Sequence, residues 1–282
     1  MCELFAMSAR QPANVRFSLE EFSRHGGLAG PHKDGWGIAW YEGADARLVK
    51  EPSAASDSAC LGFIQDHPFR SATVVGHIRR ATQGRLTLAN TQPFTRELGG
   101  LVHVFAHNGD LDGARLRTSL QLGAYHPVGE TDSEYAFCAL LERLSGLWRE
   151  AKQAPPVAMR LALVSAFAAG LRALGPANFL YADGDALFVH GHKRTHADGI
   201  RPPGLHLLCR TCAAEAGTFT AEGLSIEPAG IAQEVVIAAS VPLTAGEPWR
   251  ALADGEVIAV RGGRVLDPGE SRHRRSPPRP LT

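Results

Sequence analysis

Two adjacent predicted helices near the middle of the chain limit its fold more than any other feature. The first is predicted over 131–151, where Thr131 and Glu134 fit a capping box and leucines recur at helical spacing. The second is predicted over 155–174, because prolines begin it and Gly175 follows it. Strand-rich sequence lies on both sides of this pair. The order predicts an α+β domain in which sheets and helices pack in layers.

Strands are predicted wherever apolar and polar residues alternate between clusters of turn-forming residues. The predicted strands cover 35–42, 46–51, 72–82, 101–111, a hairpin over 178–192, 204–210, 234–240 and 255–266. In the strand at 101–111, the dipeptide Asn108-Gly109 is typical of turns and predicts a break. The segment 269–282 is rich in proline and arginine and offers no core residues, so a disordered tail is predicted behind one domain at 2–268.

The charge balance and the cysteines exclude several functional classes. Basic and acidic residues each number 29, so the net charge is zero and nucleic acid is not an expected partner. The five cysteines are odd in number and scattered, which argues against a disulfide framework and favours a reducing compartment. The longest apolar run, 161–171, is too short to cross a bilayer, and the N-terminus lacks a signal-peptide pattern. We therefore expect a soluble, cytoplasmic protein with no membrane partner.

Cys209 and Cys212 form a C-x-x-C pair, which is the spacing of many zinc ligands. No second pair accompanies them, and a strand over this segment would place the two side chains on opposite faces. We therefore expect buried or incidental thiols here and no metal site.

Cys2 directly follows the initiator methionine, and its small side chain favours removal of Met1. The mature chain would then begin with a residue that carries both a thiol nucleophile and a free α-amine able to accept a proton. One residue would thus supply a nucleophile and its base. The alternative is an ordinary frayed chain end.

Four polar clusters interrupt the otherwise well-patterned strands, and two of them precede residue 85. In the first, 33–40, two glycines flank a tryptophan, which either permits close approach of another segment or forms a tight turn. In the second, 76–84, Arg79 and Arg80 are neighbours on a strand and point to opposite faces. One of them can therefore face inward and bind a carboxylate, whereas the alternative is a pair of solvated charges.

The other two clusters contain groups that suit a reaction centre or a charged ligand. The third combines 90–94 with 105–111, where the side-chain amide of Asn108 and the backbone N–H of Gly109 have the character of an oxyanion hole. The alternative for this pair is a simple turn. The fourth, 129–134, begins the first predicted helix, and its Asp132 either caps that helix or faces a ligand ammonium.

Taken in order, Cys2 and the motifs DGWGIAW, GHIRRATQG, NTQPF, AHNGDL and GETDSE resemble the glutaminase domain of class II glutamine amidotransferases, which are N-terminal-nucleophile hydrolases. The resemblance is dense from residue 2 to about residue 145 and extends to about residue 265. It implies a four-layer αββα sandwich with the N-terminal residue in the cleft. It also implies that Cys2 is the nucleophile, that its α-amine is the base, and that Asn108 and Gly109 form the oxyanion hole.

The resemblance further implies how the substrate is held. Arg79 matches the arginine that binds the α-carboxylate of glutamine, and Asp132 matches the acid that binds the α-ammonium. Thr82 matches a residue that helps to hold the substrate. Arg80 is a departure, since some well-known members carry an aromatic residue at that position.

The implied activity is the release of ammonia from the side-chain amide of glutamine through a Cys2 thioester, without a metal or an organic cofactor. The glutaminase fold should use most of the chain, so a first hypothesis is a glutaminase subunit that supplies a separate ammonia-accepting synthase. A second is a hydrolase of a γ-glutamyl amide, as in family members that trim a γ-glutamyl group during ergothioneine synthesis. A third is a non-catalytic glutamine-binding protein, against which the complete set of predicted site residues argues.

Overall fold

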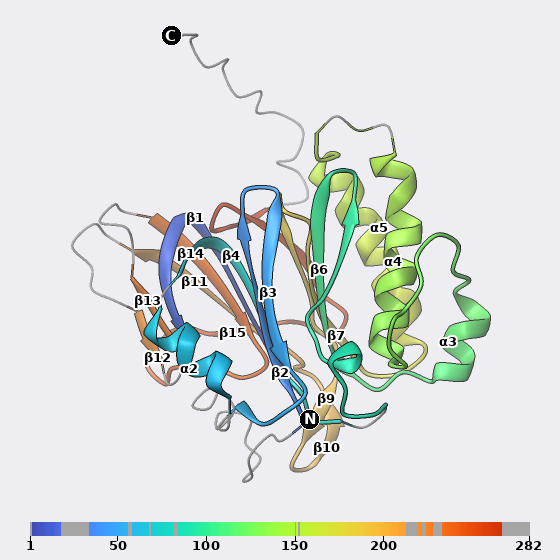
Figure 1. The fold of residues 1–282 in the computed structure, drawn as a ribbon, viewed down its shortest axis with the longest axis horizontal. Coiled ribbons are helices and arrows are strands. Elements are labelled where there is room, and N and C mark those ends of the chain that lie inside the picture. The colour runs from blue at the N-terminus through green and yellow to red at the C-terminus, as the bar shows by residue number, and fades with distance from the viewer. Residues whose placement is uncertain are drawn as a thin grey trace, which may run out of the picture.

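The computed structural model describes residues 2–17, 34–55, 58–67, 69–81, 84–149, 151, 153–212, 219–221, 224–227 and 233–266. Thr82 and the predicted tail at 269–282 lie outside these residues. The described residues form two antiparallel sheets that pack face to face, with helices on their outer faces (Figure 1).

The larger sheet has nine strands among the described residues, and its main path runs β15-β11-β14-β1-β4-β2-β3. Two further short strands pair at its side, β12 with β13 and β13 with β1. The strands are β1 (Glu3–Phe17), β2 (Trp36–Glu42), β3 (Asp45–Glu51), β4 (Phe69–Ile78), β11 (His206–Cys212), β12 (Phe219–Ala221), β13 (Leu224–Glu227), β14 (Gln233–Ala239) and β15 (Arg250–Ala251).

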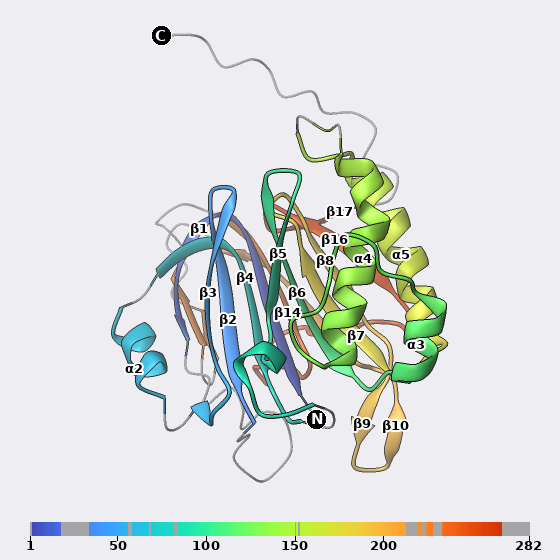
Figure 2. The same cartoon turned by 45° about the vertical axis from the view of Figure 1, so that its right-hand side comes forward.

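The smaller sheet has six strands in the order β17-β16-β8-β7-β6-β5. Its strands are β5 (Phe94–Leu98), β6 (Leu101–Gly109), β7 (Ala177–Ala182), β8 (Leu187–His190), β16 (Val257–Arg261) and β17 (Arg264–Leu266). A separate hairpin of β9 (Arg194–His196) and β10 (Gly199–Arg201) projects beside the N-terminal end of the chain (Figure 2).

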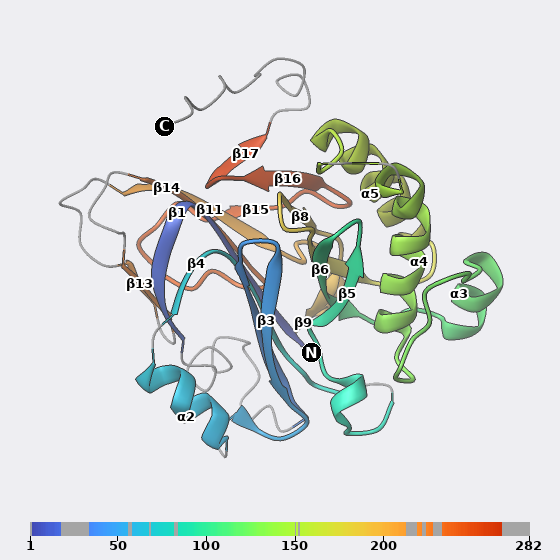
Figure 3. The same ribbon diagram turned by 45° about the horizontal axis from the view of Figure 1, so that its top comes forward.

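The helices lie on the two outer faces of the sandwich. Helix α2 (Ala59–Asp66) packs outside the larger sheet, and α3 (Gly113–Ser119), α4 (Asp132–Trp148) and α5 (Val157–Arg172) lie outside the smaller one (Figures 1 and 3). A short 3-10 helix, η2 (Leu88–Asn90), precedes β5. Within the described parts of the chain, no helix combines the length and the apolar composition that crossing a bilayer requires.

Three separate hydrophobic clusters fill the spaces between these layers. The first joins the outer face of the larger sheet to Leu61 and Ile64 of α2. The second lies between the two sheets, and the third lies between the smaller sheet and α3, α4 and α5. Alternation along β1 shows the division, because Leu4 belongs to the cluster between the sheets and Phe5 to the outer one. The predicted four-layer αββα sandwich is therefore confirmed.

Strand β1 is absent from the strands predicted from sequence, yet it lies at the centre of the larger sheet. It pairs with β4 on one side and with β14 on the other. Its register against β4 shifts between Ser8 and Ala13, and Pro12 lies within this irregular stretch. The irregularity disrupts the alternation that would have indicated the strand. Because β1 begins at Glu3, Cys2 lies at the end of a central strand and is not a frayed terminus.

The predicted helices are confirmed as α4 and α5, the predicted strands 35–42 and 46–51 as the paired β2 and β3, and the predicted hairpin over 178–192 as β7–β8. The predicted break at Asn108-Gly109 is wrong, because β6 continues through both residues. They pair with Asn178 and Ala177 of β7. Pairing with this distant strand outweighs the local turn preference of the dipeptide.

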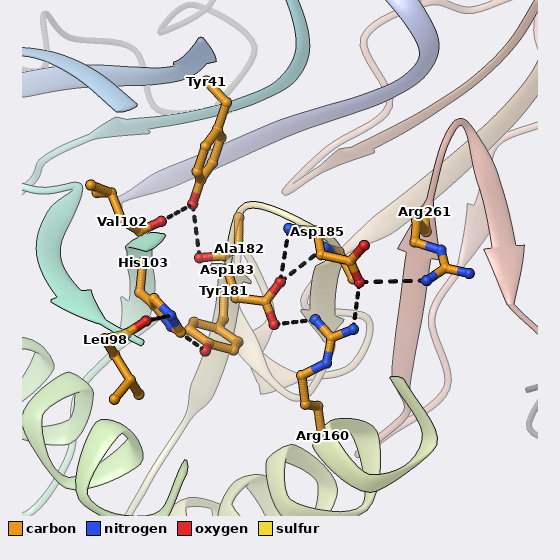
Figure 4. Close-up of polar contacts among 11 residues, drawn as sticks. Tyr41, Leu98, Val102, His103, Arg160, Tyr181, Ala182, Asp183, Asp185 and Arg261 are labelled. Carbon is orange, nitrogen blue, oxygen red and sulfur yellow. Dashed lines mark hydrogen bonds and ion pairs between the residues drawn. The ribbon is translucent and has the colours of Figure 1, made fainter. Parts of the chain in front are cut away.

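A buried polar network closes the end of β7 that is remote from Asn178 (Figure 4). Arg160 of α5 donates to Asp183 and to Asp185, each at 2.5 Å, and Asp185 also pairs with Arg261 at 3.5 Å. Beside them, the ring of His103 lies 2.6 Å from the hydroxyl of Tyr181 (Figure 4). Burial lowers the pKa of His103 to about 4, so this ring is neutral and accepts hydrogen bonds as well as donating them.

His190 makes the stability of the fold depend on pH. Burial, with the charges of Arg172, His192 and His107, lowers its pKa to about 3. An unfolded histidine titrates near ~6.5, so the unfolded chain binds more protons between these values and stability is lost as the pH falls through this window. Neither ring nitrogen of His190 has a hydrogen-bond partner among the described residues, and the ring packs edge-on against Phe179.

We therefore expect His190→Phe to flatten the acid limb of the stability curve. At pH 4.5 the variant should gain roughly 2 kcal/mol over the wild type, relative to their difference at pH 7. Urea unfolding at the two pH values measures this change. The exposed His126, replaced by phenylalanine, serves as the control and should show no such gain. An equal acid loss in His190→Phe and in the wild type would contradict the assignment.

Candidate active site

Three strand ends of the larger sheet bring Cys2 beside the arginine pair. Ile78, the last residue of β4, lies opposite Glu3 of β1 and opposite Trp36 of β2. The residues just beyond these ends are therefore neighbours. The Cys2 thiol lies 3.3 Å from both the backbone nitrogen and the backbone oxygen of Arg80.

The surroundings of the half-buried Cys2 thiol act on its ionisation in opposite directions. Burial raises its pKa above the usual value, because a thiolate is poorly solvated there. The hydrogen bond from the Arg80 N–H and the charge of the Arg79 guanidinium favour the thiolate. The donors that would stabilise a thiolate are thus already in place around the sulfur.

The end of β6 contributes Asn108 from the other sheet. Its side-chain nitrogen donates to the backbone oxygen of Cys2 at 2.6 Å, so the predicted nucleophile and the predicted oxyanion donor are in contact across the sandwich. An amide nitrogen carries two N–H groups, and this contact uses one of them. Asn178 of β7 fixes the strand end by donating to the backbone oxygen of Asn108 at 3.0 Å.

Gly109 follows Asn108 in β6, and its position admits no side chain. A Cβ atom there would lie 1.9 Å from the backbone oxygen of Pro176 and 2.7 Å from Nε2 of His107. Only glycine therefore allows the chain just before β7 and the end of β6 to approach this closely. The structure places Asn108 and Gly109 at the end of β6 that lies nearest Cys2.

Asp132 is the first residue of α4 and lies against the chain that follows Gly109. Its carboxylate accepts from the backbone N–H of Leu111 and from that of Ser133, each at 2.8 Å. The helix cap is Thr131, whose hydroxyl accepts from the Glu134 N–H at 3.2 Å. The alternative in which Asp132 caps the helix is therefore wrong, and its carboxylate instead holds the segment behind the oxyanion residues.

Arg79 and Arg80 have opposite environments, although both follow β4, which ends at Ile78, and neither is part of the strand that was predicted to include them. Arg79 is 3% exposed, and its guanidinium donates to the backbone oxygens of Gly84 at 3.3 Å and Arg85 at 3.1 Å. Burial lowers its pKa, whereas Cys2 and Asp34 raise it. Arg80 is exposed. The inward arginine is thus Arg79, and its guanidinium lies close enough to Cys2 for the charges of the two groups to interact.

Two residues that support this site were not predicted from the sequence. Asp34 accepts from the backbone N–H of Ala81 at 2.8 Å and so ties the start of β2 to the segment after the arginine pair. Glu3, next to Cys2, forms a buried ion pair with Arg194 at 2.9 Å. The first had a signal, because Asp34 belongs to the flagged cluster 33–40. The ion pair between Glu3 and Arg194 had no sequence signal, because 191 positions separate the two residues.

The close approach predicted for the cluster 33–40 is confirmed. A Cβ atom at Gly37 would lie 2.3 Å from the backbone oxygen of Gln92, so the segment around Gln92 packs directly on β2. In the part of the chain that the structure describes, no group of three or more His, Cys, Asp and Glu side chains is arranged to hold a metal ion. The donors gathered here are a thiol, an amide, a guanidinium and a carboxylate, which suit acyl transfer from an amino-acid amide.

Comparisons with known sequences agree with this geometry. The family model for glutamine amidotransferases class-II matches residues 1–280. YafJ of Escherichia coli (strain K12), which carries the name of a glutamine amidotransferase, is 38% identical over 259 residues, covering 91% of this chain and 96% of YafJ. A similarly named protein of Haemophilus influenzae is 32% identical over 268 residues, covering 94% of this chain and 86% of that protein.

Solved structures extend the likeness to the fold. A Pseudomonas aeruginosa crystal structure, described as a glutamine amidotransferase, has 37% sequence identity and a TM-score of 0.72, covering 94% of this chain and all of that one. The glutamine phosphoribosylpyrophosphate amidotransferase of B. subtilis has 16% identity and a TM-score of 0.55, and 48% of its length is covered. At that identity the match concerns the fold alone. The chain therefore belongs to the class II glutamine amidotransferases and has their N-terminal-nucleophile hydrolase fold.

Proposed function

We propose that the protein hydrolyses the side-chain amide of glutamine, or of a γ-glutamyl amide, through a thioester on Cys2. The contact of 2.6 Å between the Asn108 amide and the Cys2 backbone carries this proposal, because it joins a nucleophile to an oxyanion donor across two sheets. After removal of Met1, the α-amine of Cys2 would accept the thiol proton. The thiolate would then attack the amide carbon.

The remaining steps follow from the same groups. Charge that develops on the amide oxygen would be stabilised by the Asn108 side chain and the Gly109 N–H. The α-ammonium of Cys2 would protonate the leaving nitrogen as the C–N bond breaks, so that ammonia departs and a γ-glutamyl thioester remains. Water would hydrolyse the thioester to glutamate and regenerate the thiol. None of these steps needs a metal or an organic cofactor.

The substrate would be held at its amino-acid end. Arg79 is buried beside Cys2 and offers a planar fork that matches a carboxylate, which suits the α-carboxylate. The Asp132 carboxylate lies at the start of α4 and suits the α-ammonium. Thr82, predicted to assist in binding, lies outside the described residues.

The proposal is tested by incubating the Met1-processed protein with glutamine and with a panel of γ-glutamyl amides, following release of ammonia or amine together with glutamate. Turnover of glutamine or of any panel member supports the proposal, and the preferred member identifies the leaving group. If none is turned over, adding candidate ammonia-accepting synthases tests the subunit hypothesis. Glutamine binding without turnover under all these conditions would leave a non-catalytic binding protein.

The two arginines provide a specific prediction about substrate binding. Arg79→Lys keeps the positive charge but loses the planar fork, so KM for glutamine should rise by roughly 10-fold or more. Arg80→Lys should change KM little, because that side chain is exposed. Steady-state hydrolysis of glutamine measures both. Equal effects of the two substitutions would contradict the assignment of Arg79 as the inward carboxylate-binding group.

A further inference from the structure

Asn90, at the end of η2, connects two parts of the site that are distant in sequence. Its side-chain nitrogen donates to the backbone oxygen of Arg85 at 3.0 Å, and its side-chain oxygen accepts from the backbone N–H of Glu130 at 2.8 Å. The side chain is 1% exposed. A buried amide with a partner at each end acts as a rigid spacer, because breaking either bond leaves a buried polar group unsatisfied.

The two ends of this spacer lead directly to the proposed binding groups. The backbone oxygen of Arg85 that accepts from Asn90 also accepts from the Arg79 guanidinium at 3.1 Å. At the other end, Glu130 lies two residues before Asp132. A continuous path of hydrogen bonds and short backbone therefore joins Arg79 to Asp132 through one side chain.

The fit around Asn90 is close on both sides. A Cβ atom at Gly129 would lie 2.3 Å from its side-chain oxygen, and one at Gly84 would lie 3.0 Å from its side-chain nitrogen. Both flanking segments therefore need glycine for the amide to span them. The backbone of Asn90 is itself fixed, since its N–H donates to the backbone oxygen of Thr87 at 3.1 Å.

We propose that Asn90 is a positioning residue that sets the distance between Arg79 and Asp132, and thereby the selectivity of the site for an α-amino-acid end. The proposal rests on the function proposed above, in which those two groups bind the α-carboxylate and the α-ammonium. Asn90 itself does not touch the substrate. Its effect is on the simultaneous fit of two charges whose separation in the substrate is fixed by a single carbon atom.

Three amide substrates test the contributions of the α-amine and the α-carboxylate separately. They are L-glutamine, 4-carbamoylbutanoate, which lacks the α-amine, and 4-aminobutanamide, which lacks the α-carboxylate. The measurement is kcat/KM for each, expressed as two ratios of glutamine to analogue. Dissociation constants for the Cys2→Ala protein give the same two ratios without turnover.

In Asn90→Ala both ratios should fall together by roughly tenfold, the effect expected when a buried hydrogen bond that fixes a binding group is lost. Asn90→Asp keeps the acceptor for Glu130 but places an oxygen against the Arg85 carbonyl, and both ratios should fall here too. A general loss of folded protein would lower all three rate constants alike and leave the ratios unchanged.

Gln92 provides a matched control in the same segment. It is a buried amide that also makes two hydrogen bonds, but both join it to the backbone of His107, at 2.6 and 3.2 Å, next to the oxyanion residues. Gln92→Ala should therefore lower kcat for all three amides and leave the ratios unchanged.

The results distinguish this proposal from the proposed function. A wild type that prefers glutamine to neither analogue would overturn the proposed binding roles of Arg79 and Asp132, and the role of Asn90 with them. A wild type with strong preferences that Asn90→Ala retains, or loses for only one analogue, would overturn the positioning role of Asn90 and leave the proposed function intact.

Discussion

Cys2→Ala is expected to reduce kcat for amide hydrolysis by roughly 10⁴-fold or more, because the reaction loses the atom that forms the thioester. Binding of glutamine should change little, since the proposed binding groups, Arg79 and Asp132, are untouched. Steady-state release of ammonia gives the first quantity, and calorimetric titration of the variant with glutamine gives the second. Activity that survives this substitution would exclude a thioester on Cys2.

A second test concerns the α-amine of Cys2, which is proposed to be the base, and leaves its thiol unchanged. A variant that retains one residue ahead of Cys2 keeps the thiol but converts the amine into an amide, which cannot accept a proton. It should fold normally and lose activity, with intact-mass spectrometry confirming the extra residue. Full activity in such a protein would show that another group is the base.

Labelling distinguishes Cys2 from the other thiols. A glutamine-like alkylating reagent should modify Cys2, and glutamine should protect it. Burial raises the pKa of Cys138 to about 11, and the nearby Glu51 raises that of Cys60. Neither thiol has the Arg80 N–H and the Arg79 guanidinium that favour the thiolate of Cys2. Labelling of Cys60 or Cys138 that glutamine does not prevent would be nonspecific. If glutamine instead protects a cysteine other than Cys2 from labelling, that cysteine would be the nucleophile.

Asn108→Ala is expected to lower kcat by roughly 10²–10³-fold, the usual cost of removing one oxyanion donor. Its amide faces charge that exists only in the transition state, so glutamine binding to a Cys2→Ala background should change much less. Asp132→Asn provides the contrast. The α-ammonium that Asp132 is proposed to hold is present before and during the reaction, so this substitution should weaken binding and kcat/KM together.

Asn108 also contacts the Cys2 backbone, so Asn108→Ala could lose activity for two reasons. The nucleophile could be displaced, or the oxyanion donor could be missing. Asn108→Asp keeps the size of the side chain, but its carboxylate can donate neither to the Cys2 carbonyl nor to an oxyanion, so the reactivity of the Cys2 thiol is measured alongside kcat. It should be at least as inactive as Asn108→Ala while Cys2 still reacts with a small neutral alkylating reagent. If kcat is intact in Asn108→Ala, Asn108 only supports the strand end and the catalytic assignment is wrong.

Local patterns predicted those elements whose residues interact within a few positions of one another. Helices α4 and α5 and the hairpins β2–β3 and β7–β8 lie close to their predicted ranges, and the Thr131 cap is present. The capping box is only half formed. Glu134 accepts from the Gly129 N–H at 2.6 Å and binds Arg96, and does not return to the Thr131 backbone. Helix α2 and strand β1 were not predicted from sequence, because one is short and the other contains an irregular register.

The order of the site residues and their chemical character can be read from the chain alone: a thiol behind the initiator methionine, an arginine pair near the end of a predicted strand, an amide next to a glycine, and an acid at a helix start. Which of these groups come into contact depends on how the two sheets pack. Asn108 and Gly109 lie in a strand because β7, some seventy positions later, pairs with them, and Asn90 bridges two loops that the sequence does not connect. The physical reason is the sequence separation over which each kind of interaction acts. Side-chain periodicity, caps and turns act over a few residues, whereas contacts between the ends of distant strands form only when the two sheets pack together.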